Sequence, residues 1–557
     1  VAIDNGVDIP SVHGGGADLH LGFAQALRQL VCSVRYLVPT IIVPISSFAF
    51  FLTHYAINVD DLSGWRYFSG ELIAQGRFTW PLISMLCGID GNVPPVADVF
   101  GIVAHTASAL AFSALFVSRS NGRFSVASAT VFSALYLSCP LVTESFSYAG
   151  LSVAIGFGSL IAAVAIALTS ARTSSTVRML LYCAIAIALL VFGISWYESV
   201  ASVYMCATMF VLILCNRVDL PVRLQLREAA IDGCRAALTL AVAVVAEWAI
   251  SEGLIAALGI EHSHNASNVV GIATGSGMGE VLREWLFDYG VMGLFYLPIA
   301  VLVLACFAAL VLAAAEAWRT RLPVRPVLYM GMLLSLVSIS LLSGAAAPYR
   351  TAQVVPFFVA CIGAMCFSQL HPPTHRAKRV SIALSEALCC LLIVLQIVDT
   401  NHWFMVDWER YVQERGIVQA ISDDLHKRGI EHKPVIFVGK FHLDGTWEDA
   451  AYVSSDDMRA VLLESAHNFG RVHLEYDKCL KVQQLNEYIT WAQGAFGSQS
   501  ELFAFFEWCG CPLVEPDVAA IPEYAWHAVE LPDWPEPDSI MDRGDFVVVK
   551  LGATFPP

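Results

Sequence analysis

Two adjacent carboxylates, Asp60 and Asp61, follow the first long apolar run of the sequence, and Trp65 and Arg66 come shortly after them. Two neighbouring negative charges repel each other, so the pair favours taking up a proton or binding a cation such as Arg66 or a metal ion. Acidic residues here also suit the N-terminus of an amphipathic helix that begins near Ser63. The pair therefore predicts either a general acid–base site or a helix cap, and its surroundings must decide between them.

The composition places this loop in a membrane protein. Of the 557 residues, 57% are apolar and only 14% are charged, and the mean hydropathy is +0.62. Lipid cannot satisfy backbone polar groups, and the apolar runs are continuous rather than alternating, so the spans are expected to be helices and not strands of a barrel. We expect a polytopic α-helical protein with about 11 transmembrane helices of about 20 residues each. They centre on Leu37–Ile57, Val96–Val117, Phe124–Val142, Leu151–Thr169, Met179–Ser195, Ser199–Cys215, Ala236–Ile255, Tyr289–Ala315, Val327–Leu342, Thr351–Leu370 and Val380–Val398.

The distribution of arginine and lysine predicts the orientation through the positive-inside rule. One set of loops carries most of these residues, and the opposite set offers four arginines. We therefore expect a cytoplasmic N-terminus, with Asp60, Asp61 and the C-terminal region on the outer side. The net charge of −16 comes mainly from the chain after about residue 400, which argues against a nucleic-acid surface. The four outer arginines are Arg66, Arg77, Arg283 and Arg350.

Three regions follow from this pattern. Residues 1–35 form a cytoplasmic N-terminal segment with an amphipathic helix over Leu19–Val34, residues 36–399 form the transmembrane domain, and residues 58–95 are its first outer loop. A second surface-lying helix is expected over Val222–Arg235, before the seventh span. Residues 400–557 predict a small extracytoplasmic α/β domain. Its expected elements are a helix with an apolar stripe from Val412 to Leu425, strands at Pro434–Val438 and Asp545–Lys550, and helices at Asp456–Ser465 and Gln499–Trp508.

The cysteines indicate little chemistry. Most of the 15 lie in apolar spans, where they act as small hydrophobic side chains. Cys479, Cys509 and Cys511 lie in the polar C-terminal region, and one disulfide among them is expected as an alternative to free thiols if that region is extracytoplasmic. Their spacing does not match a zinc site.

Arg350 stands alone at the outer end of the ninth span, in Ala347-Pro-Tyr-Arg-Thr. An arginine at a helix end either extends to the membrane interface or faces a polar cavity. A charge at the membrane centre costs roughly 2.5–3.5 kcal/mol on insertion scales, which favours contact with an anionic group such as a phosphate. Glu144 and Tyr148 suit either binding of sugar hydroxyls or a loop contact. Glu247 and His105 lie nearer the middle of spans, where satisfied helix–helix contacts are expected.

These features together resemble a known family. The first span ends in an acidic pair, an arginine follows, Gly76-Arg77 comes after an interfacial segment, and a C-terminal domain follows many spans. This arrangement resembles the Gtr-type polyprenyl-phosphate-dependent glucosyltransferases that modify bacterial O-antigen. The loop Pro140–Tyr148 adds to the resemblance, as does Tyr197-Glu198, although a Tyr-Gln pair is expected there.

The resemblance implies a GT-C-like fold in the bacterial inner membrane. It also implies transfer of a hexose, with glucose expected by family analogy, from a polyprenyl-phosphate-linked donor to a lipid-linked or surface glycan on the periplasmic side. It also implies that a carboxylate of the first outer loop is the base, which is chemically reasonable because a sugar hydroxyl must lose its proton as it attacks. We assign the base to Asp60 and an orienting role to Asp61. No cofactor is expected, and a divalent metal is not favoured. The expected phosphate-binding residues are Arg350, Arg66 and Arg77, with pairing to Asp60 or Asp61 as the alternative for Arg66 and Arg77. The expected acceptor- or sugar-binding residues are Glu144, Tyr148, Trp65, Tyr197 and Glu198.

Two other classes stay open at the level of sequence. An O-antigen polymerase or ligase also has many spans, but it takes whole glycans from pyrophosphate lipids and is expected to have outer loops richer in arginine and histidine. A transporter or sensor with an outer ligand-binding domain is the non-enzymatic alternative. Transporters often have repeated halves and ionisable residues at mid-membrane, and this sequence has few such residues and no visible repeat.

Overall fold

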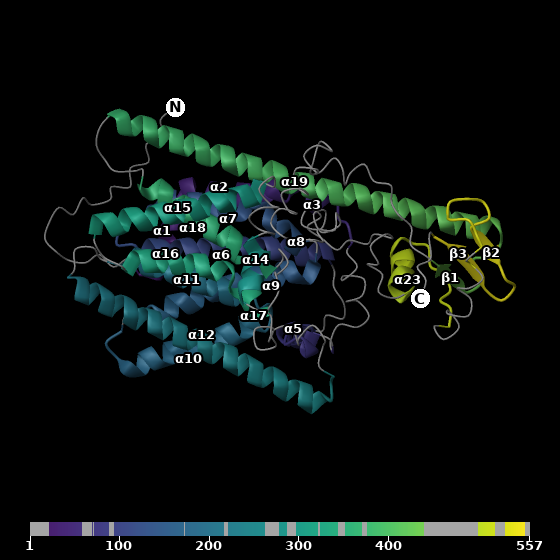
Figure 1. The fold of residues 1–557 in the computed structure, drawn as a ribbon, viewed down its shortest axis with the longest axis horizontal. Helices are drawn as coiled ribbons and strands as arrows, with labels where there is room; N and C mark the ends of the chain where they lie inside the picture. The colour runs from purple at the N-terminus through teal and green to yellow at the C-terminus, as the bar shows by residue number, and fades with distance from the viewer. Residues whose placement is uncertain are drawn as a thin grey trace.

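The computed structural model of the chain is a long helical bundle with a small strand-containing unit at one end (Figure 1). It describes residues 22–57, 70, 72–87, 94–146, 148–171, 173–216, 221–261, 278–286, 297–320, 324–343, 351–369, 376–438, 499–517, 528 and 530–551.

The first span is broken into pieces. Helix α1 (Phe23–Val31) lies inside the predicted amphipathic segment and meets α2 (Val34–Ser47) at a bend of 76°. A second interruption at Phe48 separates α2 from the short helix α3 (Ala49–Thr53). The predicted span over residues 37–57 is therefore interrupted at Phe48, before the predicted acidic loop.

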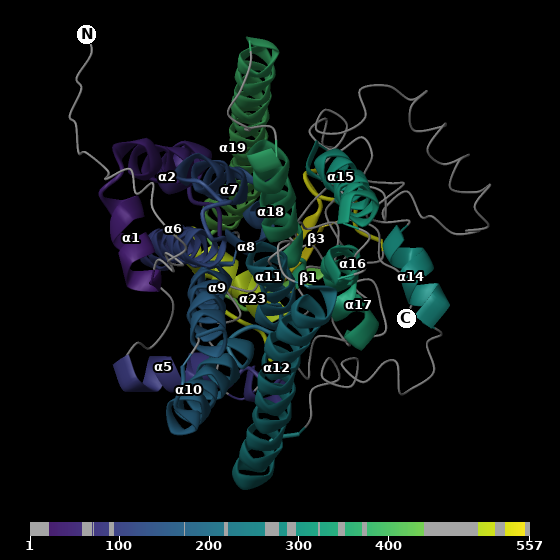
Figure 2. The same cartoon turned by 90° about the vertical axis from the view of Figure 1, so that its left-hand side faces the viewer.

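The centre of the bundle is formed by helices whose side chains are almost entirely buried, and Figure 2 shows α11 and α18 inside it, with α1 and α5 at its edge. Helices α6 and α9 pack closely because small residues face each other: a Cβ added to Gly156 would lie 2.8 Å from Ala104 Cβ. The bundle elements are α5 (Thr79–Cys87), α6 (Pro94–Arg119), α7 (Val126–Ser138), η1 (Pro140–Val142), α8 (Thr143–Phe146), α9 (Ala149–Thr169), α10 (Thr176–Ile194), α11 (Val200–Cys215), α12 (Val222–Leu258), α14 (Met278–Leu286), α15 (Leu297–Thr320), α16 (Val324–Leu336), α17 (Ser338–Ser343) and α18 (Val354–Gln369).

Helix α12 corrects one expectation. The predicted surface helix over Val222–Arg235 and the predicted seventh span form one helix of 37 residues. It begins after Pro221 and ends at Gly259, which adopts a left-handed conformation with φ of 65°. No proline lies between Pro221 and Gly259. The amphipathic segment Val222–Arg235 and the apolar segment that follows it therefore form one continuous helix.

Each of the eleven predicted spans coincides with a helix or a helix pair. Among the described residues, six helices are long and apolar enough to cross a membrane, and the bent α1–α2 pair makes a seventh candidate. Four further apolar helices, α7, α11, α16 and α18, are shorter than a full span. The chain is therefore a mostly helical membrane protein, while the exact number of crossings stays a prediction.

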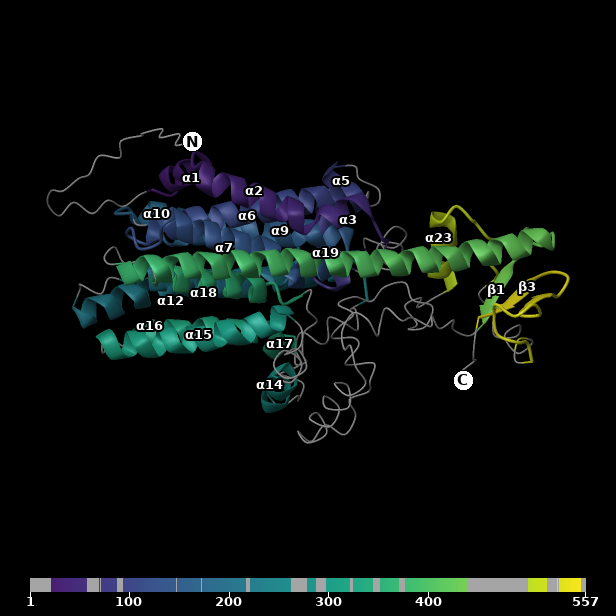
Figure 3. The ribbon, with the colours of Figure 1, turned by 90° about the horizontal axis from the view of Figure 1, so that it is seen from above.

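Helix α19 (Arg376–Lys427) runs along the bundle and continues without interruption into the C-terminal unit (Figure 3). The predicted boundary between residues 399 and 400 falls inside this helix and stays a prediction. The predicted strands are present as β1 (Val435–Val438) and β3 (Val547–Lys550), which pair in parallel. Strand β2 (Ile540–Asp542) pairs antiparallel with β3, and α23 (Gln499–Trp508) matches its predicted bounds.

The predicted disulfide receives no support from the described cysteines. Cys509 and Cys511 are both free thiols. Cys479 lies outside the described residues, as does the predicted helix over Asp456–Ser465.

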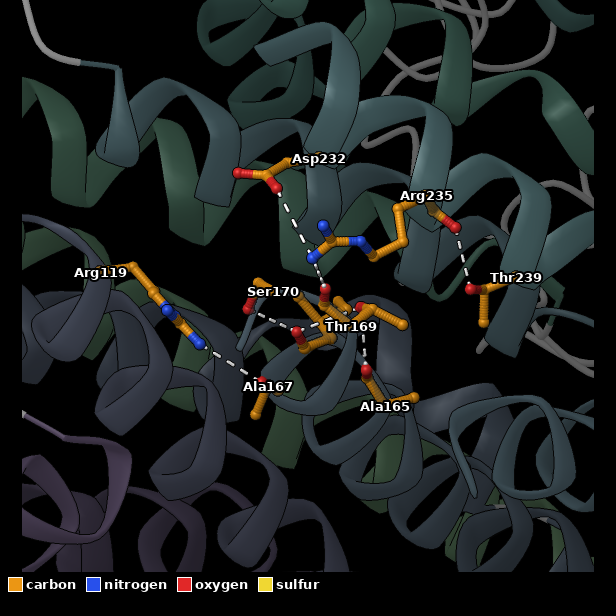
Figure 4. Close-up of polar contacts among 9 residues, drawn as sticks. Arg119, Ala165, Ala167, Thr169, Ser170, Asp232, Arg235 and Thr239 are labelled. Carbon is orange, nitrogen blue, oxygen red and sulfur yellow. Dashed lines mark hydrogen bonds and ion pairs between the residues drawn. The ribbon is translucent and has the colours of Figure 1, made fainter. Parts of the chain in front are cut away.

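Two arginines that the sequence assigns to cytoplasmic loops donate hydrogen bonds to the C-terminal end of one helix, α9. Arg119 donates to Ala167 O at 3.3 Å, and Arg235 donates to Thr169 O at 3.1 Å while approaching Asp232 at 3.8 Å (Figure 4). The last carbonyls of a helix lack partners within it and carry partial negative charge, so a guanidinium stabilises them. The guanidinium groups of Arg119 and Arg235 therefore stabilise the C-terminal end of α9.

Candidate functional site

The structure describes part of the predicted site. Tyr148, Tyr197, Glu198 and Arg77 are described in full, whereas only the backbone of Glu144 is, within α8. The remaining predicted site residues lie outside the described residues. They are Asp60, Asp61, Trp65, Arg66 and Arg350.

Arg77, Tyr197 and Glu198, which are far apart in the sequence, come together in one cluster. Arg77 Nη2 donates to Glu198 Oε1 at 2.9 Å, and Arg77 Nε donates to Glu198 Oε2 at 3.3 Å. The guanidinium carbon also lies 4.7 Å from the centroid of the Tyr197 ring. A two-bond contact with a carboxylate and an aromatic face below it fix both the position and the plane of a guanidinium. We call Arg77, Tyr197 and Glu198 the arginine cluster.

Two of the three side chains of the cluster are partly exposed. The side chains of Arg77 and Glu198 are 30% and 40% exposed, whereas Tyr197 is buried. The sequence left open whether Arg77 binds phosphate or pairs with Asp60 or Asp61. In the structure it pairs with Glu198, and it keeps enough exposed surface for an anion to approach.

Two turns hold the cluster in place. Gly76 has φ of 83°, and Arg77 N donates to Leu72 O at 2.7 Å, which closes the turn that ends the preceding helical segment. Thr79 then attaches this turn to the end of α10: its hydroxyl donates to Phe192 O at 3.0 Å and lies 2.5 Å from Ser195 Oγ. The loop of Arg77 and the turn of Tyr197 and Glu198 are thereby held together.

A third element reaches the same turn. A Cβ added to Gly76 would lie 3.3 Å from Glu247 Oε1 and 3.5 Å from Ser251 Oγ, both on α12. The sequence analysis placed Glu247 in a helix–helix contact, and the structure places its carboxylate beside the backbone of the residue that precedes Arg77. Its signal in the sequence was an acidic residue inside an apolar helix, which is costly and is retained mainly where the residue faces a polar site.

Tyr148 is less suited to the role predicted for it. Its side chain is 5% exposed, at the N-terminal end of α9. The neighbouring α8 is held by Gln353, whose Nε2 donates to Ser145 Oγ at 2.5 Å. In this conformation Tyr148 offers a sugar almost none of its surface.

His105 also differs from expectation. Its side chain is buried, its ring centroid lies 4.4 Å from that of Tyr136, and neither ring nitrogen has a hydrogen-bond partner among the described residues. The expected helix–helix contact is present as packing of the His105 ring against Tyr136 of α7.

Metal binding is not addressed by the described residues. Within them, no three His, Cys, Asp or Glu side chains gather closely enough to hold an ion. The predicted pair Asp60 and Asp61 lies outside that search.

Comparison with known proteins identifies the relationship of the chain. Residues 49–368, more than half of the sequence, match the family model described as "Glucosyl transferase GtrII". No curated protein matches the chain. Among solved structures, the archaeal oligosaccharyltransferase AglB from Archaeoglobus fulgidus, in complex with an inhibitory peptide and a dolichol-phosphate, is 11% identical with a TM-score of 0.34. The alignment covers 83% of this chain and 64% of AglB.

Proposed function

Because this chain belongs to the glucosyl transferase GtrII family, and is therefore a membrane glycosyltransferase, we propose that it moves a hexose, specifically glucose, from a polyprenyl-phosphate-linked donor to a lipid-linked O-antigen or another surface glycan. The proposed location is the periplasmic side of the bacterial inner membrane. The observation that carries the proposal is the arginine cluster, which holds a partly exposed guanidinium at the end of the bundle opposite Arg119 and Arg235.

The proposed reaction is a single displacement with inversion. The acceptor hydroxyl oxygen attacks the anomeric carbon, the bond from that carbon to the phosphate oxygen breaks, and polyprenyl phosphate leaves with the bonding electrons. Asp60 accepts the hydroxyl proton, and Asp61 orients Arg66 or the acceptor. One well-placed carboxylate is sufficient for this route, whereas a double displacement needs a second as nucleophile.

Arginine side chains are proposed to stabilise the leaving phosphate, whose negative charge grows as the bond breaks. Arg350 and Arg66 are the first candidates. Arg77 joins them because Glu198 and Tyr197 fix its guanidinium while 30% of its side chain stays exposed. A donor with a single phosphate can be neutralised by arginine, so the proposal needs no metal ion.

The acceptor is proposed to lie against the exposed part of Glu198 and the carboxylate of Glu144, with Trp65 as a stacking surface. Carboxylates accept hydrogen bonds from sugar hydroxyls, and an aromatic ring packs against the apolar face of a pyranose.

The test compares two donors. Purified protein in lipid nanodiscs is incubated with a lipid-linked glycan acceptor and either glucosyl polyprenyl phosphate or a pyrophosphate-linked glycan. The proposal expects a covalent glucosylated product from the phosphate donor only. Transfer from the pyrophosphate donor alone would identify a polymerase or ligase, and uptake of labelled sugar into proteoliposomes without any covalent product would identify a transporter.

A further inference from the structure

The interruption at Phe48 in the first span is bridged by a side chain from a distant part of the sequence. Phe50 N donates to Asn401 Oδ1 at 3.0 Å, and Asn401 Nδ2 donates to Ser46 O at 2.8 Å. In an uninterrupted α-helix, Phe50 N would donate directly to Ser46 O, four residues earlier. The Asn401 amide therefore takes the place of one helical hydrogen bond at the interruption between α2 and α3.

The orientation of this amide is fixed by its partners. Asn401 Nδ2 also donates to Ile397 O at 2.8 Å, one turn earlier in its own helix. Two carbonyl oxygens lie on the nitrogen side and one N–H lies on the oxygen side, so a flipped amide would lose all three hydrogen bonds. The contact is thus specific for asparagine.

Further along α19, aromatic side chains follow the same segment. Phe404 stacks on Phe51 with centroids 4.5 Å apart, and Trp408 meets His54 edge-on at 5.3 Å. Helical residues spaced by three or four positions share one face. The α19 face, as we call it, consists of Asn401, Phe404, Trp408 and Tyr411, and it contacts the first span from Ser46 to the chain beyond α3.

The C-terminal unit covers the last described residues before the predicted acidic loop. Ala56 and Ile57 are 7% and 5% exposed and belong to the hydrophobic core that also contains Tyr411, α23 and β3. Tyr55 meets Trp508 of α23 edge-on at 6.5 Å, and Trp508 Nε1 donates to the Tyr411 hydroxyl at 3.1 Å. A segment of the membrane domain is thus built into the core of the C-terminal unit.

We propose that the α19 face and the C-terminal unit are positioning elements for the predicted catalytic carboxylates. The chain from Ile57 to Asp60 is three residues long and spans no more than about 11 Å. Fixing Ile57 therefore restricts where Asp60 can lie, and a displacement of about 1 Å in a reacting group is enough to cost on the order of 100-fold in rate. This inference rests on the proposed function, because it takes Asp60 or Asp61 as the base.

The continuity of α19 favours a positioning role for the C-terminal unit. It argues against a unit that moves on a flexible tether to capture the acceptor. The helix has no break between its contacts with α2 and α3 and its contacts with the strands. A domain that moves to collect an acceptor needs a flexible linker. Here the connection is the helix α19, which packs against the membrane domain at one end and against the C-terminal unit at the other.

The first measurement asks whether α19 holds the segment. Hydrogen exchange followed by mass spectrometry is recorded for peptides covering residues 48–57 in the full chain. We expect Asn401→Ala to accelerate exchange of these peptides at least fivefold, because the Phe50 amide loses its acceptor. Asn401→Asp, which has the same size but no Nδ2 donor, serves as a second variant. Met405→Ala is the matched control, since the Met405 side chain of α19 is exposed.

The second measurement asks whether holding the segment affects turnover. With glucosyl polyprenyl phosphate as donor, Asn401→Ala and Tyr55→Ala are expected to lower kcat at least tenfold per folded protein with donor KM unchanged. Tyr55→Phe, which keeps the ring beside Trp508, is expected to restore kcat. A purely structural role would lower the amount of folded protein and leave kcat per folded molecule normal.

The outcomes separate this inference from the proposed function. Normal kcat per folded protein in both Asn401→Ala and Tyr55→Ala overturns the inference, whatever the exchange rates and the carboxylate variants show. Asp60→Asn and Asp61→Asn alone test the base, and normal turnover in both overturns that assignment. In an Asp60→Asn background, the loss caused by Asn401→Ala is expected to disappear, because both changes act through one group. A full additional loss there contradicts positioning through Asp60.

Discussion

Arg77→Ala tests the arginine cluster most informatively. A hydrogen bond to a charged group contributes about 1.5–3 kcal/mol, and each 1.4 kcal/mol is a factor of ten in affinity. Because the side chain of Arg77 is 30% exposed, water competes for it, and the lower half of that range applies. We expect the Kd for polyprenyl phosphate to rise about 12- to 40-fold, measured by titration of purified protein in nanodiscs.

Two matched variants complete this experiment. Glu198→Gln keeps an oxygen that accepts from Arg77, and an ion pair at this exposure contributes up to about 1 kcal/mol, so its Kd should change by no more than about fivefold. Arg178→Ala removes the same charge from an exposed position at the opposite end of α10 and should leave the Kd unchanged. An unchanged Kd in Arg77→Ala would refute phosphate binding and leave Arg77 as a structural ion pair.

Three further predictions concern stability and reactivity. Gly76→Ala would hold an alanine in a left-handed conformation (φ of 83°) and should destabilise the protein by about 1–2 kcal/mol. Gly253→Ala, at a helix position with open space around it, should stabilise the protein by about 0.5–1 kcal/mol. Thermal unfolding midpoints that move in the same direction in both variants would contradict this. Arg325→Ala leaves Glu316, its partner at 2.9 Å, as a buried charge and should cost about 3–5 kcal/mol, so an unchanged midpoint would show that water reaches the pair. Burial raises the pKa of the Cys509 thiol to about 12, so native protein should resist maleimide labelling of Cys509 at pH 8 until it is unfolded, and rapid labelling would disprove its burial.

The helices were predictable because a membrane span leaves a continuous apolar run of about 20 residues. The continuity of α12 and of α19 was not, because a polar stretch inside a helix resembles a boundary when only hydropathy is read. At residues 399–401, Asp-Thr-Asn suggested the edge of a domain. Thr400 is instead buried and donates to Ser138 O at 3.2 Å, and Asn401 bonds the first span. Tertiary partners, which spacing does not reveal, make these polar residues compatible with a packed helix.

Which residues belong to the site was more predictable from the sequence than which of them contact each other. Arg77, Tyr197 and Glu198 were each singled out from the sequence, but Arg77 and Glu198 are 121 positions apart and nothing in the spacing indicates that they pair. Glu247 was given a packing role because one acidic residue in an apolar helix has no visible partner in the sequence. Its approach to Gly76 follows from how α12 crosses the turn before α5, which only the folded bundle determines.

The central claim is that a carboxylate of the first outer loop takes the proton from the acceptor. The most direct measurement is transfer of radiolabelled glucose from glucosyl polyprenyl phosphate to a lipid-linked glycan by wild-type protein, Asp60→Asn and Asp61→Asn, each shown to be folded and inserted. We predict a loss of about 10²- to 10⁴-fold in kcat for Asp60→Asn, as expected for removal of a general base. Near-normal transfer by both variants would contradict the claim.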